Sequence, residues 1–496
     1  MSLGKNILAN YVSQIYVTLI GVVMVPLYIK YMGAETYGLV GFFAMLQAWF
    51  NLLDMGLTPT VARETARYHG GALSALEYRR LVRALEGVFI AVALVGGIAL
   101  LSVSGYIAQH WLQASVLPTA EVASAVQLMA IIIALRWTCG LYRGVISGSQ
   151  RLVWLSGFNS AVASLRFVGV IPLLMYVGAT PALFFGFQLG VAIVELALLC
   201  LFAYKLLPRL SDAPSPAWAW EPLKPVLKFS LSIAFTSSVW VLVTQTDKLV
   251  LSKLLPLAEY GHFTLSVLVA SGVMLLSGPA SSVIMPRMTK MEAEGDQEGL
   301  IRVYRQATQL VVVLAGSAAI TIAFCAEPLL WAWTGDRELA QRAAPVLTLY
   351  ALGNGVLAVS AFPYYLQYAK GDLRLHLIGN ALFVVLLLPL IIWGASSYGA
   401  MGAGYVWLGM NLLTFVAWLP FVHRKFVLGL NFKWYGIDVL PIISGSTIVA
   451  FGLSFGLSDN LGRIGQFVVI CIYGCLIACA GGLCSSAIRS FKSRLI

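Results

Sequence analysis

The chain has 496 residues and a formal net charge of +11, with 59% hydrophobic but only 11% charged side chains. Soluble domains average about 25% charged residues. This composition therefore excludes a water-soluble globular protein and indicates that most of the chain lies in lipid.

Windows of about 20 apolar residues predict membrane-spanning helices. The first apolar run begins near Ile7, is about 24 residues long and has no A-x-A cleavage site, which predicts a retained helix rather than a signal peptide. We therefore expect an all-α polytopic membrane protein with about fourteen transmembrane helices. The predicted spans are 7–30, 37–58, 84–108, 121–142, 153–176, 181–204, 229–253, 259–286, 308–333, 343–368, 375–397, 401–422, 437–457 and 464–487.

Polar side chains follow one face of the first predicted span at spacings of three and four residues. In lipid, such a stripe must face protein or water. It either lines a wet cavity, where Asn10 and Gln14 would contact a substrate, or forms hydrogen bonds between helices. The stripe consists of Asn6, Asn10, Ser13, Gln14 and Thr18.

The stretch "KYMGAETYG" (30–38) returns as "KLLPLAEYG" (253–261), with Lys, Tyr and Gly in register. Each repeat contains six predicted spans, and an even number of spans restores the same orientation in the membrane. The sequence therefore predicts two six-helix lobes, residues 1–212 and 213–432, in a parallel pseudo-twofold repeat around a central cavity. Residues 433–496 would add two C-terminal helices.

Basic residues are distributed unevenly between the two ends of the spans. With the N-terminus in the cytoplasm, 24 of the 32 Lys and Arg residues fall at cytoplasmic ends and loops and five fall in outer loops. The positive-inside rule thus predicts that both termini are cytoplasmic. This bias also accounts for the net positive charge, so a nucleic-acid partner is not expected.

Cationic side chains inside spans are rare and usually functional. Arg166 lies 13 residues into its span, at a depth of about 20 Å. Arg136 and Lys248 lie nearer to span ends, so each either faces a cavity or extends to the interface. Because a guanidinium group matches phosphate oxygens at two points, these residues are candidate ligands of an anionic headgroup.

Acidic side chains inside spans are candidates for ion coupling by H⁺ or Na⁺, because a buried acid can exchange protons. They are Glu195, Asp54 and Asp247. Glu195 has an alternative interpretation as a structural partner of Arg166 at similar depth. Asp54 has an alternative as a helix cap near the end of its span.

Other chemistries lack their motifs in this sequence. There is no G-x-x-x-x-G-K-[ST] loop for ATP and no H-E-x-x-H metal motif. The seven cysteines lie in or beside spans and are expected to pack rather than to bind metal. The longest predicted outer loops have about a dozen residues, whereas a membrane-bound ligase or polymerase would need larger outer loops that carry its catalytic groups. We expect no cofactor, no metal and no catalytic activity.

Three segments resemble the polysaccharide transport proteins of the multidrug/oligosaccharidyl-lipid/polysaccharide (MOP) superfamily, which include the Wzx-type O-antigen flippases. They are "PLYIKYMGAETYGLVGFFA", "TDKLVLSKLLPLAEYGHFTLS" and "RETARYHGG", and the resemblance extends over about residues 1–430. It implies transfer of an undecaprenyl-diphosphate-linked oligosaccharide, such as an O-antigen or another polysaccharide repeat unit, across the bacterial inner membrane by alternating access. It also implies that Arg166, Arg136 and Lys248 correspond to cationic cavity residues.

The same resemblance leaves two alternatives, a cation-coupled multidrug exporter of the same fold and a flippase for a peptidoglycan lipid precursor. The partners that we expect are the lipid-linked oligosaccharide, the surrounding membrane lipids and H⁺ or Na⁺ where transport is driven. Association with the polysaccharide polymerase machinery would suit such a role.

Overall fold

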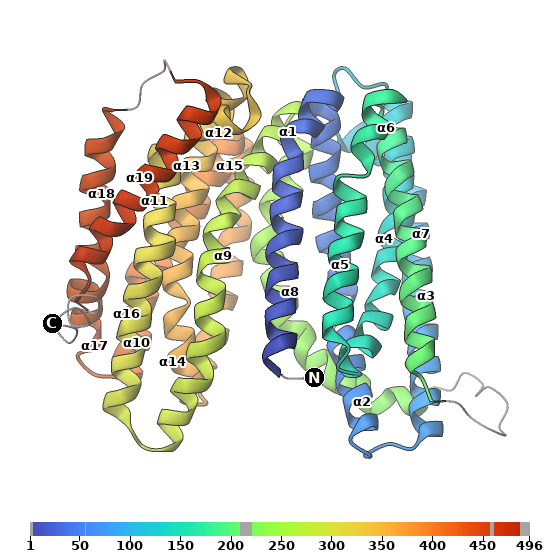
Figure 1. Cartoon of the computed structure of the whole chain (residues 1–496), viewed down its shortest axis with the longest axis horizontal. Coiled ribbons are helices and arrows are strands. Elements are labelled where there is room, and N and C mark those ends of the chain that lie inside the picture. The colour runs from blue at the N-terminus through green and yellow to red at the C-terminus, as the bar shows by residue number, and fades with distance from the viewer. Residues whose placement is uncertain (1–2, 55, 209–220, 457–460, 487–496) are drawn as a thin grey trace. The chain divides into compact units, whose positions relative to one another are not determined.

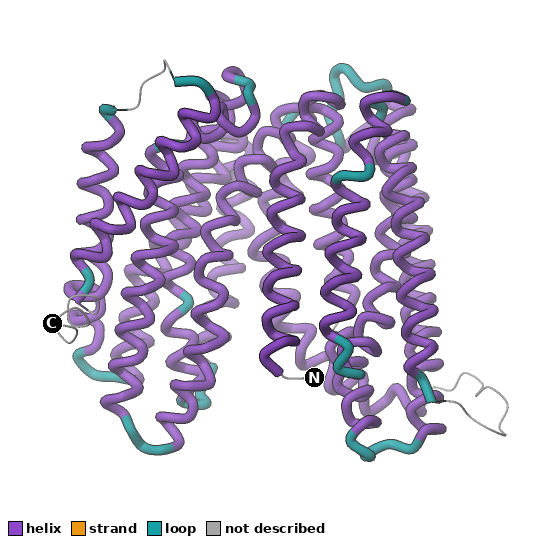
Figure 2. The backbone as a smooth tube through the Cα atoms, in the orientation of Figure 1, coloured by secondary structure: helices purple, strands orange, loops and turns teal. Residues whose placement is uncertain are grey.

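A computed structural model describes residues 3–54, 56–208, 221–456 and 461–486, which are helical apart from short connections and include no strand (Figure 2). Contacts between residues divide the chain into two compact units, Met1–Gly261 and His262–Ile496. The boundary predicted at 212/213 lies outside the described residues, and the predicted domain limits stay a prediction.

The first unit contains helices α1 to α8 in its described residues, and Figure 1 shows α3, α4, α5 and α7 running side by side. Helix α4 packs against α2, α3 and α7, while α1 packs against α5 and α8. The buried core of α2, α3, α4 and α7 is built around Tyr78, Phe89 and Trp137. The helices are α1 (Leu3–Phe50), α2 (Leu57–His69), α3 (Ala75–Tyr106), α4 (Thr119–Gly148), α5 (Leu152–Phe167), α6 (Val170–Tyr176), α7 (Pro181–Leu206) and α8 (Lys224–Leu254).

The second unit contains most of α9 and all later helices. Helix α13 packs against α11, α12 and α15, and α18 packs against α19. Its core surrounds Tyr304, Phe362 and Trp434. The helices are α9 (Leu257–Ala293), α10 (Gln297–Val311), α11 (Ser317–Phe324), α12 (Ala326–Thr334), α13 (Arg337–Ser360), α14 (Phe362–Ala369), α15 (Arg374–Leu413), α16 (Leu419–Phe426), α17 (Leu430–Lys433), α18 (Leu440–Ser454) and α19 (Arg463–Cys484).

The helices described here confirm the predicted fold class. Eleven of them are long and apolar enough to cross a membrane. Two of these, Leu8–Asp54 and Arg374–Phe426, have 47 and 53 residues and are interrupted at Gly33 and Gly399, whose φ angles are positive. About 20 residues suffice for one crossing, so each of these segments accounts for two predicted spans. Helix α8 covers the remaining span, 229–253. The chain is a multi-pass membrane protein.

The repeated glycines of the two echoed segments lie at a close backbone crossing within the first unit. A Cβ atom at Gly38 would lie 2.2 Å from the carbonyl oxygen of Leu257, and one at Gly261 would lie 2.8 Å from that of Ala34. The second half of α1 and the start of α9 therefore touch through their backbones. Small residues permit such an approach between membrane helices, which gives the recurrence of glycine a physical cause.

Substituting alanine for Gly38 is expected to destabilise the protein by about 1–3 kcal/mol, because the added methyl group cannot move away from the backbone of Leu257. Thermal unfolding of the purified protein in detergent micelles measures the change. The matched control is Gly186→Ala in α7, where a Cβ would meet nothing within 4 Å; we expect unchanged or slightly higher stability there. Equal melting of Gly38→Ala and wild type would contradict the crossing.

Candidate functional site

Two helices of the first unit bring polar and charged side chains together by a spacing of seven residues. Helix α4 carries Arg136 and Arg143, and α7, which packs along it, carries Gln188 and Glu195. Seven residues are about two helical turns, so each pair lies on one face of its helix. Arg166 approaches from the last turn of α5.

Glu195 lies between the two guanidinium groups of α4. Its Oε1 forms an ion pair with Nη2 of Arg143, and its Oε2 lies 3.8 Å from Nε of Arg136. The other terminal nitrogen of Arg143, Nη1, donates to Oδ1 of Asn159 on α5 at 2.5 Å. A single carboxylate thus faces two arginines.

Arg136 and Arg166 are linked through Gln188. Nη2 of Arg136 donates to Oε1 of Gln188 at 3.2 Å, and Nε2 of Gln188 donates to the backbone carbonyl of Arg166 at 3.0 Å. Aromatic rings also face the guanidinium groups, with Phe43 at 5.7 Å from Arg136 and Phe167 at 5.1 Å from Arg166. These distances fall within the range of cation–π attraction. The amide of Gln188 thus binds the guanidinium of Arg136, and an aromatic ring faces each of the two cations.

The cluster of Arg136, Arg143, Arg166 and Glu195, called the arginine cluster below, has hydrogen-bonding capacity left over. The side chains of Arg136 and Glu195 are only 5% and 4% exposed. Among the described atoms, Nε and Nη1 of Arg136, Nε of Arg166 and Oε2 of Glu195 are buried without a hydrogen-bond partner. Buried polar groups are normally paired. With three cations and one anion, the cluster has an excess of two positive charges and suits an anionic ligand.

A family model described as a polysaccharide biosynthesis protein matches residues 3–292, more than half of the chain. The chain belongs to this family. A search of curated protein sequences finds no match.

Solved structures establish the fold of this family member as that of the MOP superfamily. It is similar to the lipid II flippase MurJ in an inward closed conformation, with a TM-score of 0.73, 13% identity and coverage of 94% of this chain and 97% of that one. For an inward-facing multidrug resistance MATE family transporter, the TM-score is 0.65 and the identity 12%, with 82% of this chain and 94% of that one covered. The chain is also similar to a MOP superfamily transporter from Pyrococcus furiosus, whose binding pocket is described as reversed in polarity. There the TM-score is 0.56 and the identity 14%, with 86% of this chain and 96% of that one covered. At these identities the likeness shows the fold alone.

The arginine cluster unites three of the residues predicted from the sequence, with different pairing. Arg136, Arg166 and Glu195 lie together, but the ion pairs that the structure records join Glu195 to Arg143 and Arg136, not to Arg166. Arg136 is buried rather than extended toward an interface. The roles of these residues in binding and ion coupling stay predictions.

The remaining candidates make local contacts. Asp54 caps α2, where its Oδ1 accepts hydrogen bonds from the backbone N–H of Thr58 at 3.2 Å and from its hydroxyl at 2.6 Å. On α8, Nζ of Lys248 donates to the carbonyl oxygen of Thr244, and Oδ1 of Asp247 accepts the backbone N–H of Lys248 at 2.8 Å. These contacts leave the predicted roles of Asp54, Lys248 and Asp247 untested.

In the polar stripe on α1, hydrogen bonding between helices is observed for Ser13. The hydroxyl of Ser13 donates to the carbonyl oxygen of Ser156 on α5 at 2.8 Å and lies 2.9 Å from the hydroxyl of Ser160, so it joins two helices. The side chains of Asn10 and Gln14 are exposed. Substrate contact by these two residues stays a prediction.

Sequence reasoning missed Arg143, Gln188 and Asn159. The predicted span 121–142 ends just before Arg143, whereas α4 continues to Gly148. The equal spacing of seven residues on α4 and α7 was the signal that could have found Arg143 and Gln188. No comparable signal marks Asn159.

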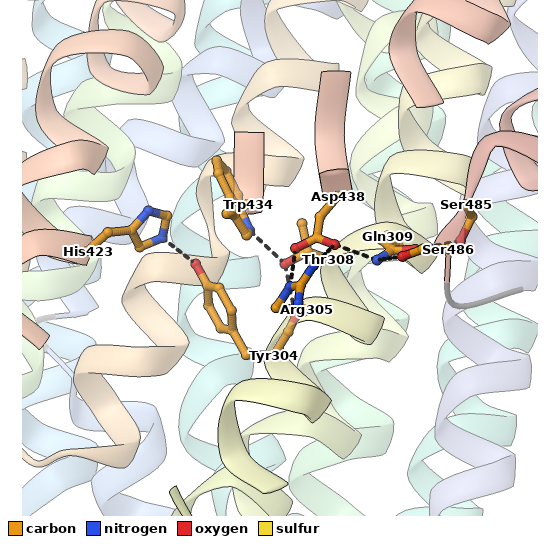
Figure 3. Close-up of polar contacts among 9 residues, drawn as sticks. All are labelled: Tyr304, Arg305, Thr308, Gln309, His423, Trp434, Asp438, Ser485 and Ser486. Carbon is orange, nitrogen blue, oxygen red and sulfur yellow. Dashed lines mark hydrogen bonds and ion pairs between the residues drawn. The ribbon is translucent and has the colours of Figure 1, made fainter. Parts of the chain in front are cut away.

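A second polar cluster, in the second unit, is centred on Asp438 (Figure 3). The carboxylate is fully buried and accepts hydrogen bonds from Arg305, with Nε at 2.6 Å and Nη2 at 2.9 Å, and from Nε2 of Gln309 at 2.5 Å. Nε2 of Gln309 also donates to Ser486, while its Oε1 accepts from Ser485. The cluster joins α10 to the π-helical turn Trp434–Val439 and to the end of α19.

Three further contacts extend this cluster, and Figure 3 shows those of Tyr304 with His423 and of Trp434 with Thr308. The hydroxyl of Tyr304 lies 2.7 Å from Nε2 of His423, whose Nδ1 lies 3.1 Å from Oδ1 of Asn431. The indole N–H of Trp434 donates to the hydroxyl of Thr308 at 3.0 Å. In contrast to the arginine cluster, the side chains drawn in Figure 3 contribute no buried unpaired atom. We interpret this cluster as a structural clamp on the C-terminal helices, and the arginine cluster as the candidate binding site.

Proposed function

We propose that this family member translocates an undecaprenyl-diphosphate-linked oligosaccharide across the bacterial inner membrane by alternating access. The observation that supports the proposal is the arginine cluster, with its buried unpaired guanidinium nitrogens. A diphosphate esterified at both ends carries two negative charges, which equals the positive excess of the cluster. Guanidinium groups bind phosphate oxygens with short, charge-assisted hydrogen bonds, and a site removed from water strengthens that attraction.

The charge of the cluster also bears on the two alternatives. An organic cation, the expected cargo of a multidrug exporter, would be repelled by an excess of two positive charges. A peptidoglycan lipid precursor carries the same diphosphate as other lipid-linked glycans. The similarity to a lipid II flippase over 94% of this chain favours that precursor as the second candidate cargo. The sugar then distinguishes the two substrates.

The remaining parts of the proposal follow the family and the charge pattern. The two lobes, residues 1–212 and 213–432, would provide the alternating access. Residues 433–496 would form additional helices, and both termini would lie in the cytoplasm. Asp54, Glu195 and Asp247 are the candidates for coupling to H⁺ or Na⁺, and the protein would act on its lipid-linked cargo without altering it chemically. Polysaccharide polymerase machinery would use the product on the outer leaflet.

Complementation in bacterial cells tests the proposal. Deleting the gene in its native host should make lipid-linked oligosaccharide accumulate on the inner leaflet and remove the surface glycan, and a plasmid copy should restore both. A parallel strain depleted of its lipid II flippase tests the second candidate. Unchanged glycan on both leaflets after deletion, together with lost resistance to organic cations, would contradict the proposal and indicate a multidrug exporter.

A further inference from the structure

We propose that Glu195 is an internal competitor of the substrate headgroup, which holds the arginines in the empty site and pairs with them again as the headgroup leaves. This inference rests on the proposed function, because it concerns the same cluster. It assigns Glu195 a role in release of the substrate rather than in binding.

The position of the carboxylate suggests the competition. Glu195 occupies donors on Arg143 and lies beside Arg136, with Oε2 at 3.8 Å from Nε. Carboxylate and phosphate groups are bound by the same guanidinium geometry. A diphosphate that reaches these two arginines must therefore take donors that Glu195 holds. Because Oε2 has no hydrogen-bond partner among the described atoms, the carboxylate is held mainly through Oε1.

Among the residues that the structure describes, the charged side chains that face Glu195 are arginines. Helix α4 contributes Arg136 and Arg143, together with the thiol of Cys139, and α5 contributes Arg166, whose charge acts on Glu195. Helix α6 carries no charged residue, and α1 places Tyr28 beside Arg166. Within the described part of the arginine cluster, Glu195 is thus the acidic group that offsets the cations.

A transporter needs binding that is strong enough for entry and weak enough for release. Three arginines without a resident anion would hold a doubly charged diphosphate tightly, and its departure would leave three neighbouring cations, among them the buried Arg136, uncompensated. Such a state is costly in a medium from which water is excluded. Glu195 lowers that cost because its carboxylate returns to Arg143 and Arg136 as the phosphates withdraw.

The test is the E195Q variant of the full chain in lipid nanodiscs, with farnesyl-diphosphate-linked N-acetylglucosamine as the probe. Removing one negative charge beside the headgroup is expected to lower the Kd by about tenfold or more. The flipping rate of the same probe in proteoliposomes should fall, because release becomes slow. A merely structural role would weaken binding instead. An unchanged or raised Kd for E195Q would overturn the inference.

The matched control is E86Q. Glu86 of α3 is a buried acid in the same unit, but it is held by Arg83 at 3.1 Å and by the hydroxyl of Tyr204 at 2.6 Å, so its replacement should leave the Kd unchanged.

Should E195Q fail to fold, E195D decides the question, because it keeps the charge with a shorter reach and should lower the Kd to a smaller extent. A folded wild-type protein that does not bind the probe refutes the proposed function; wild-type binding without tighter binding by either variant refutes the role of Glu195 alone.

Discussion

Replacing Arg136 with glutamine is expected to abolish the proposed transport of a lipid-linked glycan while leaving the free energy of unfolding unchanged or slightly higher. Truncating one partner of a buried, hydrogen-bonded charge pair costs about 2–5 kcal/mol of binding, which is about a 30- to several-thousand-fold loss of affinity. Stability should not fall, because two buried nitrogens of Arg136 have no hydrogen-bond partner among the described atoms and the side chain lies near the like charges of Arg143 and Arg166. Function and stability often oppose each other in this way.

Export of surface glycan in a deletion strain carrying the variant measures this effect, with membrane insertion and thermal unfolding measured beside it. Arg136→Lys should retain part of the activity, because it keeps the charge and loses the forked geometry. The control is Arg80→Gln on the exposed surface of α3, which should export normally. Normal export by Arg136→Gln would remove this residue from the mechanism.

Replacing Asp438 with alanine is expected to lower the free energy of unfolding by about 3–5 kcal/mol, because it leaves the guanidinium of Arg305 without its buried partner. The amide of Gln309 loses an acceptor at the same time. Since these contacts join α10 to the C-terminal helices, hydrogen exchange in α18 and α19 should rise more than in α13. Thermal unfolding in detergent micelles gives the overall change.

Asp372→Asn provides the control for this second prediction. Asp372 pairs with Lys425 at 2.7 Å on the surface of the same unit, and exposed pairs contribute about 0–1 kcal/mol. A double replacement of Arg305 and Asp438 by apolar residues of similar volume should recover much of the loss. Wild-type melting of Asp438→Ala would refute the role of this cluster as a clamp.

The number and type of the membrane helices could be predicted from the sequence because runs of about 20 apolar residues have few other stable arrangements. Even the kink at Gly33 lies between two predicted spans. The π-helical turns, such as Val312–Gly316 and Trp434–Val439, were not predicted, because they depend on packing against other helices rather than on a local pattern. The observed helix ends also differ from the predicted span ends, because charged residues such as Arg143 can continue a helix beyond the apolar run.

The partners of buried charges could not be predicted from the sequence. The rise per residue gives the depth of Arg166 and Glu195 but not the direction in which each side chain points, and Glu195 faces α4 instead. Asp438 and Arg305 are separated by 133 residues, and nothing in either span indicates the other. Such pairs depend on how helices pack, which a single sequence does not specify.

The most direct test of the central claim is a structure of the full chain in lipid nanodiscs with farnesyl-diphosphate-linked N-acetylglucosamine bound. We expect phosphate oxygens about 2.7–2.9 Å from guanidinium nitrogens of Arg136, with the carboxylate of Glu195 displaced from at least one arginine. A diphosphate bound elsewhere, with the Glu195–Arg143 pair intact and no phosphate oxygen on Arg136, would contradict the account.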